Sequence, residues 1–131
     1  MPDAIRSIEK NTTAAEWVMY MAGPTQTWAF SGQPSRLEPG SVLFFALHGL
    51  IQGVGLCVSI SDKKNRKGYY IVTTEKNQPL IDFELELRGY AQLRYLDELS
   101  RQYDGRYASL VKRLAKYTKD FLKGSLSFDQ R

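Results

Sequence analysis

The stretch Arg36–Ile60, RLEPGSVLFFALHGLIQGVGLCVSI, constrains the fold of this chain more than any other segment. It holds two apolar runs of strand length, Ser41–Leu47 and Leu50–Ile60, joined by a tight turn. Gly53 and Gly55 interrupt the second run. Because glycine weakens the interior of a strand, this pair indicates a bulge, a barrel bend, or close approach by a ligand or another backbone. The segment therefore predicts a hairpin in a small, bent β-structure.

The glycines of this hairpin do not form a phosphate-binding loop. The run Gly49–Gly55 lacks the Gly-Lys-Ser/Thr ending of such loops, and it leads into a strand. Without a helix N-terminus there is no helix dipole to hold a phosphate group. We therefore exclude a nucleotide-phosphate site here.

Three further segments have the composition of strands. Glu16–Ala22 and Tyr69–Glu75 are rich in aromatic and β-branched residues, and Leu80–Leu87 alternates between apolar and acidic side chains. No helix separates the middle strands, which argues against a doubly wound α/β sheet. The sequence predicts an α+β fold, a five-stranded pseudo-barrel with flanking helices.

The remaining segments are predicted to flank this barrel in one domain, residues 1–131. Residues 1–14 are expected to form an N-terminal arm and residues 124–131 a loose tail. Helices are predicted at 91–102 and, more clearly, at 105–123, where apolar side chains recur at helical spacing and Gly124 suits the helix C-terminus.

Composition excludes several classes of site. The single cysteine, Cys57, rules out an internal disulfide and a cysteine-based zinc site, and the single histidine, His48, argues against a multi-histidine metal site or a catalytic triad. We expect no cofactor, no metal and no catalytic residue that can be singled out. No apolar run approaches the roughly 20 residues of a membrane span, and the N-terminus does not resemble a secretory signal, so a cytoplasmic location without a membrane partner is expected.

Positive charge is concentrated in the second half of the chain. Residues 1–60 carry 3 basic and 4 acidic side chains, whereas residues 61–131 carry 15 and 10. This asymmetry favours a polyanionic partner, although an ordinary solvated surface explains it equally well. The polar segment Ser61–Gly68 is predicted to be an exposed loop. We expect nucleic-acid phosphate contacts from its cations, Lys63, Lys64, Arg66 and Lys67, and, from charge alone, from the lysine face of the C-terminal helix, Lys112, Lys116, Lys119 and Lys123.

Two aromatic side chains, Trp28 and Phe30, stand in a segment predicted to be a loop, Gln26–Ser35. Loop aromatics stack on flat ligands such as nucleobases, and the polar side chains of Ser31 and Gln33 are suited to reading a base edge. The alternative, which we weigh equally, is that one or both of the rings fill the end of the barrel.

A second distinctive segment, Arg88–Tyr95, combines two arginines with two tyrosines. Arginine binds phosphate and tyrosine stacks on bases, so Arg88 and Arg94 are candidate phosphate contacts and Tyr95 a candidate pocket residue. A salt bridge from Arg88 to a nearby carboxylate is the competing interpretation. The acidic side chains of the preceding strand are either an acidic site or simply its solvated face.

Together these features resemble the PUA-like superfamily, and within it the EVE and ASCH-type domains. The resemblance covers about residues 16–96. It rests on short motifs: the aromatic Trp17–Tyr20, the tryptophan-bearing loop at Trp28, the run Leu37–Phe45 with its Pro-Gly turn, the glycine return Gly49–Gly55, and Arg88-Gly89-Tyr90 with Leu93-Arg94-Tyr95. Ser41 stands where these domains usually carry an aspartate after the Pro-Gly turn.

The resemblance implies a pseudo-barrel that binds RNA or DNA, often at a modified base held in an aromatic pocket. Trp28 and Phe30 match the position of the tryptophan loop. The leading hypothesis is thus a non-enzymatic module that recognises a nucleic-acid base, modified or unmodified. The base, the choice of RNA or DNA, and the oligomeric state are left open.

Two other functions remain open. An ASCH-type amidohydrolase acting on a modified nucleoside would pair a lysine, a threonine and a carboxylate, for which the chain offers Lys76, Glu75 and the threonines Thr25, Thr27, Thr73 and Thr74. A protein-interaction module would instead use the C-terminal helix.

Overall fold

The structure is a computed structural model that describes residues 2–80, 87, 91–101 and 105–129 of the 131-residue chain. Its contacts divide into two compact units, Met1–Tyr95 and Leu96–Arg131. The single domain expected from the sequence stays a prediction.

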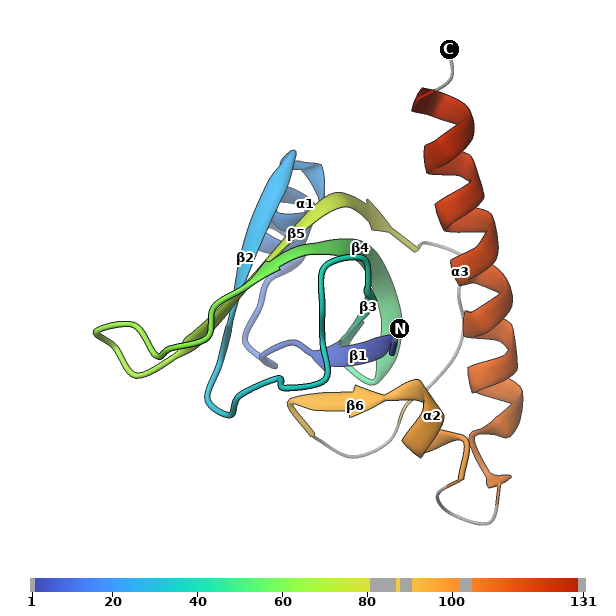
Figure 1. The fold of residues 1–131 in the computed structure, drawn as a ribbon, viewed down its shortest axis with the longest axis horizontal. Coiled ribbons are helices and arrows are strands. Elements are labelled where there is room, and N and C mark those ends of the chain that lie inside the picture. The colour runs from blue at the N-terminus through green and yellow to red at the C-terminus, as the bar shows by residue number, and fades with distance from the viewer. Residues whose placement is uncertain (1, 81–86, 88–90, 102–104, 130–131) are drawn as a thin grey trace. The chain divides into compact units, whose positions relative to one another are not determined.

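The first unit is built on one mixed sheet with the strand order β2-β5-β4-β3-β1-β6, curled into a half-barrel (Figure 1). Its elements are β1 (Ala4–Ser7), α1 (Ala14–Ala22), β2 (Thr25–Phe30), β3 (Val42–Leu47), β4 (Leu50–Ile60), β5 (Tyr70–Pro79) and β6 (Leu93–Tyr95). An α+β, barrel-like fold is thus confirmed, with six strands among the described residues instead of five. The predicted strand Leu80–Leu87 falls largely on 81–86, outside the described residues.

Strand β1 corrects the prediction of an N-terminal arm. It pairs with β3 in parallel and with β6 in antiparallel, and all four of its residues are buried. Ala4 and Ile5 are fully enclosed. A strand of four residues is too short to show an alternation of apolar and polar side chains, so the sequence does not predict it.

Helix α1 replaces the strand predicted at Glu16–Ala22. A capping box starts the helix: the Thr13 hydroxyl accepts the Glu16 N–H, and the Glu16 carboxylate accepts the Thr13 N–H, each at 3.1 Å. These bonds satisfy backbone donors that helix formation would leave free. Trp17 and Met21, four residues apart, form the buried face of the helix. The capping signal therefore outweighs the β-propensity of the aromatic residues.

The hairpin of β3 and β4 is confirmed, and its glycines mark close packing. A Cβ atom on Gly53 would lie 2.8 Å from both the Met21 sulfur and the Trp17 ring. A Cβ atom on Gly55 would meet the side chains of Asn77 and Thr74. The register shifts at β-bulges next to both positions. The glycines therefore let α1 and β5 approach β4, and the close approach is made by the protein itself.

Side chains bridge the two ends of the sheet, β2 and β6. Arg6 on β1 donates through Nη2 to the Ala29 carbonyl at 2.8 Å. The Gln92 side-chain oxygen accepts both the N–H and the hydroxyl of Ser31, each at 3.0 Å. We call this group, Arg6, Ala29, Ser31 and Gln92, the seam. The Ala29 carbonyl of β2 and the Ser31 N–H just beyond it are thereby hydrogen-bonded without a further strand.

The second unit contains α2 (Leu96–Leu99) and α3 (Ala108–Asp129). The helix predicted at 91–102 is therefore short, because 93–95 pair with β1 instead. The helix predicted at 105–123 is confirmed as α3, which begins at Ala108 and continues through Gly124 to Asp129, where a loose tail was expected. Glycine inside a helix costs only about 1 kcal/mol, which neighbouring residues can offset. As its spacing predicts, α3 buries Leu110, Leu114 and Phe121 and exposes Lys112, Lys116, Lys119 and Lys123.

Candidate nucleic-acid interface

The two aromatic residues expected in a base-binding pocket lie in the core. The first half of the segment predicted as a loop, Gln26–Phe30, belongs to strand β2, which pairs with β5 over its whole length. Trp28 is 6% exposed and Phe30 is 1% exposed. The Trp28 and Phe45 ring centroids are 4.3 Å apart, and Trp17 and Tyr20 pack against Trp28 from α1. The structure therefore corresponds to the alternative in which these rings fill the barrel.

A buried polar chain continues from this cluster. The Trp28 indole N–H donates to the Thr74 hydroxyl at 2.9 Å, and that hydroxyl donates to the Asn77 side-chain oxygen at 2.7 Å. Thr74 is fully buried. Of the threonines considered for an amidohydrolase, Thr74 is thus hydrogen-bonded inside the core, whereas Thr25 and Thr27 are exposed on β2.

The loop between β4 and β5 is exposed, as predicted, and extends outward from the sheet (Figure 1). It carries Lys63, Lys64, Arg66 and Lys67, all exposed; we call these four the basic tip. None of the four forms an ion pair with any residue that the structure describes. The Lys64 ammonium lies 5.8 Å from the centroid of the Tyr70 ring, and Tyr69 is 41% exposed. The basic tip is therefore available to an anionic partner.

One asparagine organises this loop. The Asn65 side-chain oxygen accepts the N–H groups of Lys67 and Tyr69, each at 3.0 Å. The Asn65 N–H donates to the Tyr69 carbonyl at 2.8 Å, and Gly68, at φ +86°, donates to the Asn65 carbonyl at 3.0 Å. Asparagine commonly closes turns in this way. The backbone that carries the basic tip is thus fixed by its own hydrogen bonds.

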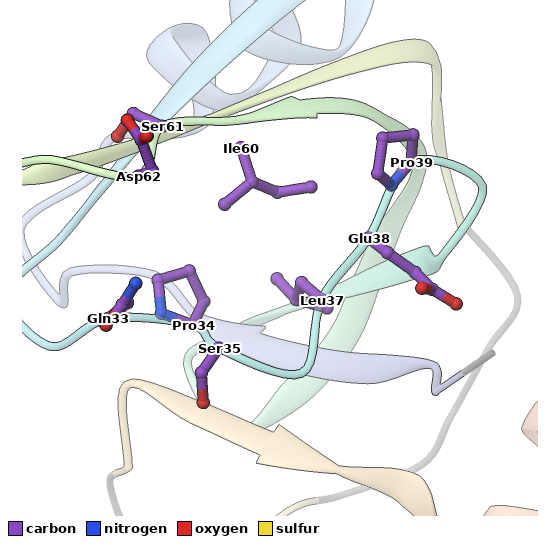
Figure 2. Close-up of a pocket in the computed structure, with 9 residues that line it drawn as sticks. All are labelled: Gln33, Pro34, Ser35, Leu37, Glu38, Pro39, Ile60, Ser61 and Asp62. Carbon is purple, nitrogen blue, oxygen red and sulfur yellow. The ribbon is translucent and has the colours of Figure 1, made fainter.

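A pocket of about 260 Å³ lies between the loop after β2 and the end of β4 (Figure 2). In Figure 2, Leu37 and Ile60 point into it, and Gln33, Ser61 and Asp62 stand at one side. Its full lining is Gln33, Pro34, Ser35, Leu37, Glu38, Pro39, Ile60, Ser61 and Asp62. Gln33 is the one residue of the predicted base pocket that lines it. Sequence reasoning missed the others because proline, serine and aspartate in a loop are ordinary turn residues.

The other predicted site residues are dispersed or already engaged. Ser31 belongs to the seam. The Tyr95 hydroxyl accepts the Arg36 N–H at 3.2 Å, and the Arg36 guanidinium lies 4.4 Å from the centroid of the Tyr95 ring. Arg94 lies on β6 and is half-buried. Arg88 is outside the described residues, as are the acidic residues Asp82, Glu84 and Glu86.

Cys57 is buried, and His48 lies in an exposed turn. Burial, and secondarily the Asp3 charge, raises the pKa of the Cys57 thiol to about 12, which keeps it protonated. The His48 ring is exposed, and its Nε2 lies 3.0 Å from the Lys10 carbonyl. In the described part of the chain, no three His, Cys, Asp or Glu side chains gather as a metal site would require.

No helix within the described ranges is long and apolar enough to cross a membrane. Comparison with protein-family models, curated proteins and solved structures finds no match for this chain.

Proposed function

We propose that this protein binds nucleic acid, RNA or DNA, through the basic tip of the β4–β5 hairpin. The observation that carries the proposal is the group of four exposed cations, without ion-pair partners among the described residues, on a loop whose backbone Asn65 holds in place.

Phosphate binding follows from the chemistry of this loop. Each Lys or Arg that neutralises a phosphate releases a condensed counterion, which is the main source of sequence-independent affinity. A loop with a fixed backbone loses less conformational entropy on binding than a mobile one. The exposed Tyr69 beside the tip offers a ring on which a base can stack.

The proposal is tested by titrating salt during binding to labelled single-stranded RNA and DNA. If the four cations each contact one phosphate, replacing all four with glutamine should reduce the slope of log affinity against log salt by about 3, at roughly 0.7 per contact. The binding constant at low salt should fall in parallel.

The lysines of α3 provide a matched control. Replacing Lys112, Lys116, Lys119 and Lys123 with glutamine removes the same charge from a different element, where the side chains are also exposed. We expect a much smaller loss of affinity and of salt slope. Failure of the wild-type protein to bind either nucleic acid would refute the proposal, as would a loss of binding confined to the α3 variant.

A further inference from the structure

The pocket beside the basic tip is lined by apolar side chains and by polar side chains that carry no positive charge. Among its lining residues none is a lysine or arginine, and two are carboxylates, Glu38 and Asp62. Such a lining disfavours phosphate and favours a ligand that presents hydrogen-bond donors. The pocket therefore differs in charge from the basic tip, although Asp62 directly precedes Lys63 in the chain.

We propose that this pocket holds a single nucleobase and selects bases that carry an exocyclic amino group. This inference rests on the proposed function, since the basic tip would hold the phosphates of the same strand. It adds which part of the nucleic acid enters the protein and which bases are preferred.

The walls of the pocket suit the flat faces of a base. Leu37 and Ile60 point into the hollow, and Pro34 and Pro39 border it (Figure 2). Base faces bind apolar side chains because both surfaces leave water on contact. Its volume of about 260 Å³ falls just below the roughly 300–1,000 Å³ of pockets for drug-sized ligands, so it suits one ring system.

The polar side of the pocket favours an amino group. Asp62 and Gln33 stand on this side together with Ser61 (Figure 2). An ionised aspartate is an acceptor only, so it pairs with the amino group of cytosine or adenine. The oxygen that uracil or thymine presents at the corresponding position would face the carboxylate unpaired.

The walls of the pocket are also held by backbone bonds. Leu37 donates to the Pro34 carbonyl at 3.1 Å, which closes the turn that carries this wall. Across the pocket, Ser61 donates to the Ile71 carbonyl at 2.9 Å, and Ile71 donates back to the Ser61 hydroxyl at 2.8 Å. These bonds keep the cavity formed before a ligand enters.

The test compares oligocytidine and oligouridine RNA of equal length, so that phosphate contacts are matched. We expect wild-type protein to prefer oligocytidine by about fivefold or more, the effect of one good base contact. Asp62→Asn should abolish this preference, because asparagine can donate to uracil as well as accept from cytosine. It should not weaken binding to oligouridine.

Glu38→Gln is the matched control within the same pocket. The Glu38 carboxylate points away from the hollow in Figure 2, so this variant removes the same charge and should keep the preference. As a second readout, cytidine alone should shift the NMR signals of the Ile60 and Leu37 methyl groups more than uridine does.

The outcomes separate the two proposals. Salt-sensitive binding with equal affinity for both oligomers, unchanged by Asp62→Asn, would contradict base binding in the pocket. It would still agree with phosphate binding by the basic tip. Methyl signals that do not respond to either nucleoside would also overturn the pocket. No binding to either oligomer, together with no nucleoside response, would overturn both.

Discussion

The indole N–H of Trp28 donates to the hydroxyl of Thr74 at 2.9 Å, joining two neighbouring strands inside the core. Asn77 accepts the proton of the same hydroxyl. Because all three groups are withdrawn from water, the bonds between them are worth more intact than their individual strengths suggest.

Thr74→Val should therefore lower the free energy of unfolding by about 1–3 kcal/mol. Valine keeps the shape of threonine but leaves the Trp28 N–H and the Asn77 oxygen without their partner. Urea denaturation followed by tryptophan fluorescence measures the loss. In a double-mutant cycle, Trp28→Phe with Thr74→Val should cost less than the sum of the single changes; strict additivity would contradict the coupling.

Gly53→Ala should destabilise the protein by about 1–3 kcal/mol. The added methyl group would lie 2.8 Å from the Trp17 ring, which is itself buried between α1 and the sheet and cannot easily move. Gly32→Ala is the control, since nothing lies within 4 Å of its added methyl group. The thermal midpoint of Gly32→Ala should stay close to that of the wild type, and an equal fall in both variants would disprove the packing argument.

Cys57 should make stability depend on alkaline pH. Its pKa, about 12 in the folded protein against an ordinary value of 9.0, is raised chiefly by burial. The contribution of the neutral thiol is therefore complete below about pH 9 and is lost as the pH rises towards 12, by at most about 1.4 kcal/mol per pH unit. The difference in unfolding free energy between wild type and Cys57→Ala, measured at about pH 8 and about pH 10, should change in this direction. A constant difference would show that the thiol titrates normally.

Asn65→Ala should weaken nucleic-acid binding without changing the number of phosphate contacts. The variant loses two hydrogen bonds to the loop backbone, so the loop must be ordered when the ligand binds. We expect affinity to fall about fivefold or more, the equivalent of roughly 1 kcal/mol, while the salt slope is retained. If the salt slope fell as far as in the variant that replaces all four cations of the basic tip with glutamine, this explanation would be wrong, because Asn65 would then determine how many phosphate contacts form.

The sequence predicted those elements whose own residues carry a strong signal. The β3–β4 hairpin has two long apolar runs, and the loop Ser61–Gly68 has a polar, basic composition that predicts exposure to solvent. Both lie where expected. Helix α3 likewise follows from apolar residues at helical spacing, although it continues past Gly124, a residue type that commonly ends helices.

The misassigned elements depend on distant partners. Strand β1 exists because β3 and β6 bind it on either side, and β2 exists because β5 pairs with all six of its residues. Trp28 gave no local sign of burial, since the cavity that it fills is made by Trp17, Tyr20 and Phe45 from other elements. The capping box at Thr13 and Glu16, by contrast, is a local signal of helix α1 that the sequence itself carries.

The candidate site was predicted in its charge but not in its shape. Exposed cations can be recognised from composition, whereas the pocket is formed by two segments that are distant in the sequence, 33–39 and 60–62. Among the residues that line the pocket, only Gln33 was predicted from the sequence to contact a base.

The seam has a consequence for how this fold can vary. Where strands close a barrel by pairing with each other, changing its circumference requires a new register along every strand. Here Arg6 reaches Ala29 and Gln92 reaches Ser31, so two side chains stand where a closed barrel would have a backbone ladder. Substitutions at these two positions would therefore act on the closure of the sheet while every strand keeps its register.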